Sequence, residues 1–234
     1  PANSLPSSPP TGSPRRKGPS CFSGGPLSIP EAVLRFGTHL LWPTACPFCG
    51  ALGVPACVTC LLPLLAPPLP ADLGSLTLEA GGIHEGILRD LVLELKYGRN
   101  RPLGVVMGRA LGRIFPVPPC DILVPVPLHA DSGRGYNQSR ALAEGISREW
   151  GVPVADGLQW NGLRTAQTSL EEGERRRMPA GAILPRGKEL AGKRAVLVDD
   201  VSTTGTTLLR AADAAARGGG RAVLALAWTI APKA

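Results

Sequence analysis

The chain has 234 residues, enough for one domain of ordinary size and a small additional module. Its formal net charge of +7 and its pI near 9.5 fit anionic partners, such as phosphorylated small molecules, nucleic acid or a membrane surface, without choosing among them. Because no apolar run is long enough to cross a bilayer and the first residues lack the pattern of a secretory signal, we expect a cytoplasmic protein with no membrane span.

The first 30 residues are rich in proline, serine and glycine and show almost no apolar periodicity. A segment of this composition cannot bury enough apolar surface to offset the entropy that ordering would cost. We therefore expect a disordered tail at residues 1–30, in which the basic cluster at residues 15–17 is a solvated charge run.

Four cysteines follow the tail in two CxxC pairs, with seven residues between the pairs. Two such pairs can place four thiolates around one cation, which satisfies the closed tetrahedral shell of structural zinc. One or two disulfides are the alternative, which the lack of a secretory signal disfavours. The sequence predicts a zinc module at residues 31–66, and its predicted ligands are Cys46, Cys49, Cys57 and Cys60.

Residues 67–115 are predicted to be a linker and helical connector. The stretch 63–71 is rich in proline, and residues 76–80 fit either a strand or an irregular segment. Apolar side chains at residues 86–97 recur with the helical period of about 3.6, and a second helix is expected near residues 103–114. The basic turn between these helices is interpreted as a solvated connector.

An α/β domain is predicted at residues 116–234. A buried strand at residues 121–126 precedes a basic, glycine-containing loop with Arg134, and a helix is expected from 138 to about 150. Such a loop before a helix N-terminus can bind an anion, and a loop that only caps the helix is the alternative.

Further strands are predicted at residues 152–160, 181–184 and 222–230. Between the first two lies a polar stretch, 162–178, which fits either a mobile loop or a solvated helix with opposite charges along it. The stretch contains Arg164, Gln167 and Arg175.

A buried strand at residues 195–198 runs directly into Asp199 and Asp200, then into a hydroxyl-rich turn that opens a helix at 206–217. Ligands bind at the carboxyl ends of such strands. The turn's amides, its threonine hydroxyls and the helix N-terminus can hold a phosphate. The two carboxylates need sugar hydroxyls or a hydrated divalent cation as partners, so a ribose 5-phosphate suits the whole arrangement. An ordinary strand-to-helix turn with an aspartate cap is the alternative.

This run of apolar strand, paired aspartates and Ser-Thr-Thr-Gly-Thr-Thr resembles the 5-phosphoribosyl 1-pyrophosphate (PRPP) motif of type I phosphoribosyltransferases. The resemblance implies an α/β fold with a mainly parallel sheet flanked by helices, and Mg bound together with PRPP. It also implies that Asp199 and Asp200, as catalytic residues, hold the ribose 2- and 3-hydroxyls. The residues implied to hold the 5-phosphate are Val201, Ser202, Thr203, Thr204, Gly205, Thr206 and Thr207.

Three other features are similar to the ComF branch of this family, which is associated with competence and DNA uptake. They are the four-cysteine module, the Lys96-Tyr97 turn, and Val-Pro-Val-Pro-Leu followed by Arg-Gly-Tyr-Asn-Gln at residues 124–128 and 134–138. The similarity implies that the Arg134 loop holds pyrophosphate and that the loop with Arg164, Gln167 and Arg175 closes over PRPP. Two departures stand out: the loop is shortened at residues 130–133, and Met178 replaces a common asparagine.

Two hypotheses of function follow from this resemblance. The first is an enzyme that transfers a pentosyl group from Mg-PRPP to an acceptor that the sequence does not identify, with release of pyrophosphate. The second is a non-catalytic competence factor that binds single-stranded DNA or a helicase partner and keeps a regulatory or vestigial PRPP site. Related folds often dimerise, so a homodimer is one possible assembly, but the sequence does not identify the oligomeric state.

Overall fold

The structure is a computed structural model that describes residues 44–128, 135–161, 178–179 and 181–232. Its helical elements are α2 (Val58–Leu61), the 3-10 helix η1 (Leu62–Leu64), α3 (Gly86–Tyr97), α4 (Arg101–Ile114), α5 (Gln138–Trp150) and α6 (Thr206–Arg217). Its strands are β1 (Ala71–Asp72), β2 (Thr77–Ala80), β3 (Ile122–Pro125), β4 (Leu158–Trp160), β5 (Ile183–Pro185), β6 (Arg194–Ser202) and β7 (Arg221–Ile230).

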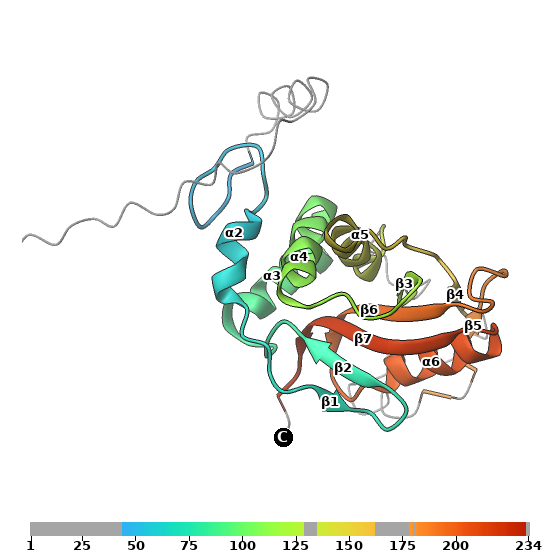
Figure 1. Ribbon diagram of the computed structural model, residues 1–234. Helices are drawn as coiled ribbons and strands as arrows, with labels where there is room; N and C mark the ends of the chain where they lie inside the picture. The colour runs from blue at the N-terminus through green and yellow to red at the C-terminus, as the bar shows by residue number, and fades with distance from the viewer. Residues whose placement is uncertain (1–43, 129–134, 162–177, 180, 233–234) are drawn as a thin grey trace, which may run out of the picture.

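The main sheet has five strands in the order β1-β2-β7-β6-β3 (Figure 1). Every neighbouring pair is parallel except β1 and β2, which are antiparallel. A second, two-stranded antiparallel sheet is made by β4 and β5. The expectation of an α/β fold with a mainly parallel sheet flanked by helices is confirmed.

Helices cover both faces of the main sheet, with α3, α4 and α5 on one face and α6 on the other (Figure 1). Alternate residues of β6 point into these two layers: Val196 and Val198 pack under α4 and α5, whereas Ala195 and Leu197 pack under α6. Burial of these side chains drives the layers together. The carboxyl end of β6 therefore emerges between two layers of helices.

The segment predicted as a connector is part of this same sheet and core. Strand β2 lies between β1 and β7, and the predicted helix at residues 86–97 is confirmed as α3. The indole Nε1 of the buried Trp228 on β7 donates to the carbonyl of Leu88, 3.2 Å away, which fixes α3 against the sheet. Helix α4 begins two residues earlier than expected, because the side chain of Asn100 caps it by accepting from the amide of Leu103 at 3.1 Å.

The prediction of one continuous strand at residues 152–160 is wrong. Val154 makes an isolated parallel bridge to Leu123 at the outer edge of β3, whereas residues 158–160 form β4 and pair with β5. Between these two pieces, the carbonyl of Gly157 accepts from the amide of Arg186 at 2.7 Å. The segment thus crosses from one sheet to the other, and its apolar pattern carries no sign of the change of partner.

None of the helices in the described part of the chain is long and apolar enough to cross a membrane.

Candidate functional site

The predicted acid pair lies at the carboxyl end of β6. The strand continues past the predicted end at Val198 and includes both aspartates, reaching Ser202. Asp199 and Asp200 are buried, with exposed fractions of 9% and 8%. Two carboxyl groups at the end of a central strand must therefore find partners in the surrounding protein or in a ligand.

Asp199 is held by hydrogen bonds from inside the protein. Its carboxylate oxygen Oδ1 accepts from the hydroxyl of Ser139 at 3.0 Å and from the amide of Asp200 at 2.9 Å. Burial, reinforced by the neighbouring charge of Asp200, raises the pKa of Asp199 from 3.8 to about 7. Near neutral pH the acid pair therefore carries less than its full two negative charges.

Asp200 is paired with a lysine from α3. The ammonium nitrogen Nζ of Lys96 lies 3.3 Å from its Oδ2, and the two side chains are only 19% and 12% exposed. The end of α3 is fixed at this place by Tyr136, whose hydroxyl donates to the carbonyl of Leu95. Burial, with smaller contributions from the charges of Asp200 and Glu94, raises the pKa of Tyr136 to about 12, so its hydroxyl keeps the proton that it donates.

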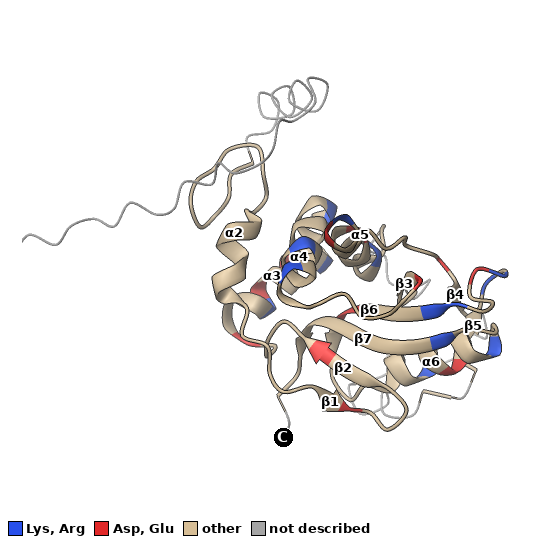
Figure 2. Ribbon diagram, in the orientation of Figure 1, with Lys and Arg blue, Asp and Glu red and all other residues tan. Residues whose placement is uncertain are grey.

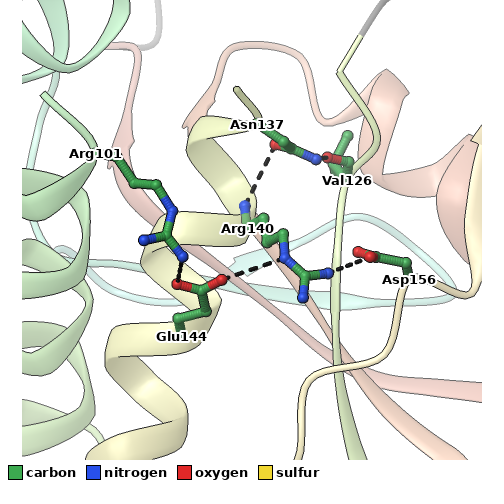
Figure 3. A network of polar contacts seen from close by, with 6 residues as sticks. All are labelled: Arg101, Val126, Asn137, Arg140, Glu144 and Asp156. Carbon is green, nitrogen blue, oxygen red and sulfur yellow. Dashed lines mark hydrogen bonds and ion pairs between the residues drawn. The ribbon is translucent and has the colours of Figure 1, made fainter. Parts of the chain in front are cut away.

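The start of α5 is fixed by a polar network that includes Asn137, Arg140 and Asp156 (Figure 3). The Asn137 side chain caps α5 by accepting from the amide of Arg140 at 3.3 Å, and it donates to the carbonyl of Val126 at 2.9 Å. Arg140 also pairs with Glu144 and Asp156. These contacts join the end of β3 to the start of α5, and so they position Ser139 beside Asp199.

The hydroxyl-rich turn leads from β6 into α6, as predicted. Gly205 has a φ of +76° and stands at the N-cap of α6, where a Cβ atom would also come within 2.7 Å of the Leu73 side chain. The backbone conformation at this position therefore favours glycine, and a larger residue would also require the Leu73 side chain to move. The hydroxyls of Thr204 and Thr206 lie 2.8 Å apart, and the amide of Thr206, the first residue of α6, donates to Oγ1 of Thr204 at 3.4 Å. Gly205 itself, at the N-cap, makes no side-chain hydrogen bond to the helix. The first amides of a helix in this situation can bind an anion.

Two buried polar atoms in the described part of the chain have no hydrogen-bond partner, and both lie in residues that border this edge of the sheet. They are Nε2 of Gln138, the first residue of α5, and Oγ of Ser202, the last residue of β6. Their residues are 2% and 3% exposed. An unsatisfied buried polar group costs about 1–3 kcal/mol, so their presence at the same edge as the acid pair favours a site built for a polar ligand.

His84 connects the same edge to α3. Its Nδ1 lies 2.8 Å from the hydroxyl of Thr229 on β7, and its amide donates to the carbonyl of Ile230 at 2.8 Å. Burial lowers the pKa of His84, and the charges of Lys96 and Arg89 lower it further, against an opposing effect of Asp200. A neutral imidazole here anchors the chain that enters α3.

The four predicted metal ligands come together in one cluster. The Sγ atoms of all four lie within 4.8 Å of one another. Cys46 and Cys49 lie on a tight turn in which Gly50 has a φ of +73°, while Cys57 and Cys60 lie at the start of α2. The Sγ atoms of Cys49 and Cys57 are 3.7 Å apart, close to the edge of about 3.8 Å expected for sulfur atoms about 2.3 Å from a tetrahedral zinc ion. This donor set fits structural zinc.

Four other predicted site residues, Arg134, Arg164, Gln167 and Arg175, lie outside the described residues. In contrast, the structure adds Ser139 and Lys96 to the site, which sequence reasoning did not select. Ser139 was an ordinary position in a helix, and Lys96 was interpreted as part of a solvated turn. The Lys-Tyr pair that resembles the ComF proteins was the one signal that pointed to Lys96.

The raised pKa of Asp199 predicts how stability changes with pH. The folded protein binds the Asp199 proton up to about pH 7, while the unfolded chain releases it near 3.8, so this group lowers the free energy of unfolding as pH rises through that interval. The slope is at most about 1.4 kcal/mol per pH unit. Denaturant unfolding of the wild type and of Asp199→Asn between pH 4 and 7 measures this contribution as a difference.

The difference between the two proteins is needed because other groups titrate in or near the same interval. The lowered pKa of His84 acts in the opposite direction, and the raised pKa of Glu79 acts in the same direction. Asp121, with a pKa lowered to about 2 by hydrogen bonds from Arg194, has its effect below pH 4. Parallel pH profiles for the wild type and Asp199→Asn would contradict the prediction.

A comparison with known protein families finds a match over the part of the chain that contains the acid pair and the hydroxyl-rich turn. Residues 138–232 match the model of the phosphoribosyl transferase domain. No curated protein matches the chain in sequence.

Several solved structures are similar to the chain at low identity. One is the allosteric regulatory enzyme of purine biosynthesis, with 22% identity over 57% of this chain and 26% of that one and a TM-score of 0.38. The glutamine PRPP amidotransferase of B. subtilis shares 20% identity, with the same coverage and TM-score. The adenine phosphoribosyltransferase of Thermoanaerobacter pseudethanolicus shares 18% identity over 59% of this chain and 83% of that one, with a TM-score of 0.37.

The present chain thus spans about a quarter of the length of the first two of these proteins. Over residues 138–232, which contain α5, the acid pair, the hydroxyl-rich turn and α6, the protein is phosphoribosyltransferase-like.

Proposed function

We propose that this protein binds PRPP with Mg at the carboxyl end of β6 and transfers its pentosyl group to an acceptor. The observation that carries the proposal is the direct succession of a buried acid pair, a hydroxyl-rich turn with Gly205 at φ +76° and the N-terminus of α6, all within the matched residues 138–232. This arrangement offers acceptors for sugar hydroxyls and donors for a phosphate within a few residues of each other.

Each part of the site has a separate role in this proposal. The 5-phosphate binds to the hydroxyls and amides of residues 201–207, because hydrogen bonds to a charged group contribute about 1.5–3 kcal/mol each. Asp200 accepts a hydrogen bond from a ribose hydroxyl. Asp199, whose carboxylate accepts a hydrogen bond from Ser139, is the second acid of the pair. Mg bound to the phosphates of the ligand would supply positive charge that the acid pair does not.

The proposed reaction is a displacement at C1 of the ribose. A nucleophilic atom of the acceptor forms a bond to C1, the bond from C1 to the pyrophosphate oxygen breaks, and pyrophosphate leaves with the electron pair. The proton of the acceptor passes to solvent or to the departing pyrophosphate. Stabilisation of the charge that develops on the leaving group is then the main task of the protein.

For the cell, we propose the role of the ComF proteins in DNA uptake. Two features support it beyond the shared phosphoribosyltransferase part: four cysteines whose Sγ atoms lie within 4.8 Å, and a Lys-Tyr turn whose lysine contacts the acid pair. In the same proposal the four cysteines hold a structural zinc ion.

The non-catalytic alternative, binding of single-stranded DNA, has one observation in its favour, the net charge of +7. However, α4 carries basic residues and the neighbouring α5 carries both acidic and basic residues (Figure 2). Arg109 and Arg113 both pair with Glu149, at 2.7 and 3.0 Å, and Arg101 pairs with Glu144. Arginines that are already paired add little to the attraction of a polyanion, so this surface favours the PRPP proposal.

Thermal unfolding with and without Mg-PRPP tests the proposed function. At 100 times its dissociation constant the ligand should add about 2.7 kcal/mol to the free energy of unfolding. Asp200→Asn should reduce this gain, because the neutral amide accepts a weaker hydrogen bond. Asp213→Asn is the matched control: Asp213 also belongs to the matched segment, but its side chain is 59% exposed and pairs with Arg210 on α6.

A wild-type protein that millimolar Mg-PRPP does not stabilise would refute the proposed binding. Release of pyrophosphate in the presence of a nucleobase or amine acceptor would support the transfer step. The alternative would be favoured by two results together. The wild type would not bind PRPP, and salt-sensitive binding of single-stranded DNA would survive the double substitution Asp199→Ala and Asp200→Ala.

A further inference from the structure

Among the described residues, Lys96 is the one cation that forms an ion pair with either of the two acids. Its ammonium nitrogen lies 3.3 Å from Oδ2 of Asp200, and its side chain is 19% exposed. The lysine belongs to the last turn of α3, and its neighbour Leu95 accepts the hydrogen bond from the hydroxyl of Tyr136. The ammonium group is therefore held at the site by a fixed helix end.

The position of Lys96 relative to the hydroxyl-rich turn follows from the two helix layers. The turn leads into α6 on one face of the sheet, whereas α3 and α5 lie on the other face (Figure 1). A ribose 5-phosphate with its phosphate at the start of α6 and a hydroxyl on Asp200 must extend across the end of β6. Its C1 atom and any group on C1 then face the α3 side, where Lys96 and Tyr136 lie.

Lys96 and Asp200 can also each exchange their mutual contact for a contact with a ligand. Asp200 gives up part of its interaction with the ammonium group when it accepts from a ribose hydroxyl. The lysine has three donors on a flexible four-carbon chain, so it can turn to a new acceptor without movement of α3. A pyrophosphate on C1 presents several anionic oxygens on this side.

We propose that Lys96 binds the pyrophosphate group of PRPP and stabilises it as it leaves C1, after exchanging Asp200 for the ligand. This inference rests on the proposed function and adds a residue to it. In the absence of ligand, the same ammonium group neutralises Asp200 and lessens the repulsion between the acid pair and an approaching polyphosphate.

A purely structural role for the pair explains the geometry less well. An ion pair with both partners largely desolvated gains little net stability, because the loss of hydration offsets most of the attraction. The end of α3 is moreover already fixed by Tyr136, and the start of the helix is fixed by the hydrogen bond from Trp228 to Leu88. An ion pair that includes an acid of the proposed ligand site is better explained by a role in ligand binding.

Calorimetry with two ligands, PRPP and ribose 5-phosphate, each with Mg, tests the role of Lys96. The variants are Lys96→Met, which keeps the length of the side chain and removes the charge, and Lys96→Arg, which keeps the charge. Arg89→Met is the control, since Arg89 is an exposed cation on the same helix. Unfolding of each variant without ligand shows whether it is folded.

We expect Lys96→Met to weaken PRPP binding about 10- to 100-fold, as loss of a hydrogen bond between charged groups does, and to change ribose 5-phosphate binding by less than about threefold. Lys96→Arg should keep most of the affinity, and Arg89→Met should bind as the wild type does. Equal weakening of both ligands by Lys96→Met, or no weakening of either, would overturn the assignment to pyrophosphate. A wild type that binds neither ligand would instead refute the proposed function itself.

Discussion

Removal of zinc should unfold the four-cysteine module. Among the described residues of the module, 44–66, the buried hydrophobic side chains apart from Cys46 are Ala56, Val58 and Leu61 around α2. Structural zinc contributes about 10–16 kcal/mol of coupled binding and folding in zinc-finger peptides, far more than burial of three side chains of this size. The folded module should therefore not survive a strong chelator.

Metal analysis and thiol reactivity check this prediction. The purified protein should contain one zinc ion per chain, and a chelator should make the four clustered cysteines reactive toward a thiol reagent. Cys49→Ser should abolish zinc binding, whereas Cys120→Ser, a cysteine outside the cluster, should leave the zinc content unchanged. Disulfides in the isolated protein, or thiols whose reactivity does not depend on the chelator, would contradict a zinc site.

Elements with a regular apolar period could be predicted closely from the sequence. The predicted bounds of α3 and α6 are those of the structure, and the helix predicted from 138 to about 150 is α5. One face of each of these helices packs on the sheet, so their periodicity directly reflects burial. Residues 152–160 failed because their partners change from β3 to β5 along the segment, and partner choice depends on the three-dimensional arrangement rather than on period.

The candidate site divides in the same way. Asp199, Asp200 and the turn to Thr207 are contiguous in sequence, so their spacing alone indicated a sugar-phosphate site. Ser139 lies 60 residues before the acid that it contacts, and Lys96 lies on another helix. These contacts depend on how α3 and α5 pack on the sheet, which no local pattern encodes. The sequence therefore pointed to the residues of the proposed site but not to the groups that contact its acid pair.

Gly108→Ala should be the most damaging single substitution in the packing of α4 against α5. A Cβ atom at position 108 would lie 2.0 Å from the carbonyl oxygen of Leu142 and within 3 Å of two more of its backbone atoms. On the facing helix, a Cβ at Gly145 would lie 2.1 Å from the carbonyl oxygen of Val105. Backbone atoms cannot rotate away as a side chain can. The two helices would have to separate along their contact.

The expected loss in the free energy of unfolding is about 3 kcal/mol, at the upper end of the range for overpacking. This outweighs the gain of about 1 kcal/mol that alanine brings over glycine in a helix interior. Gly98→Ala serves as the control, because a Cβ there would meet only the flexible end of the Glu94 side chain. Urea unfolding gives both values, and a loss below about 1 kcal/mol for Gly108→Ala would show that α4 and α5 can part at little cost.

The same substitution should also weaken PRPP binding, although Gly108 lies on α4 and has no place in the acid pair. Helix α5 carries Ser139, whose hydroxyl holds Asp199 at 3.0 Å, and Gln138, whose buried Nε2 lacks a partner in the described residues. A shift of α5 by a few tenths of an ångström lengthens the first contact and moves the second group. We therefore expect Gly108→Ala, studied below its unfolding temperature, to lose affinity for Mg-PRPP. Unchanged affinity in a destabilised Gly108→Ala protein would mean that the start of α5 is held by Asn137 and Arg140 alone, independently of its packing on α4.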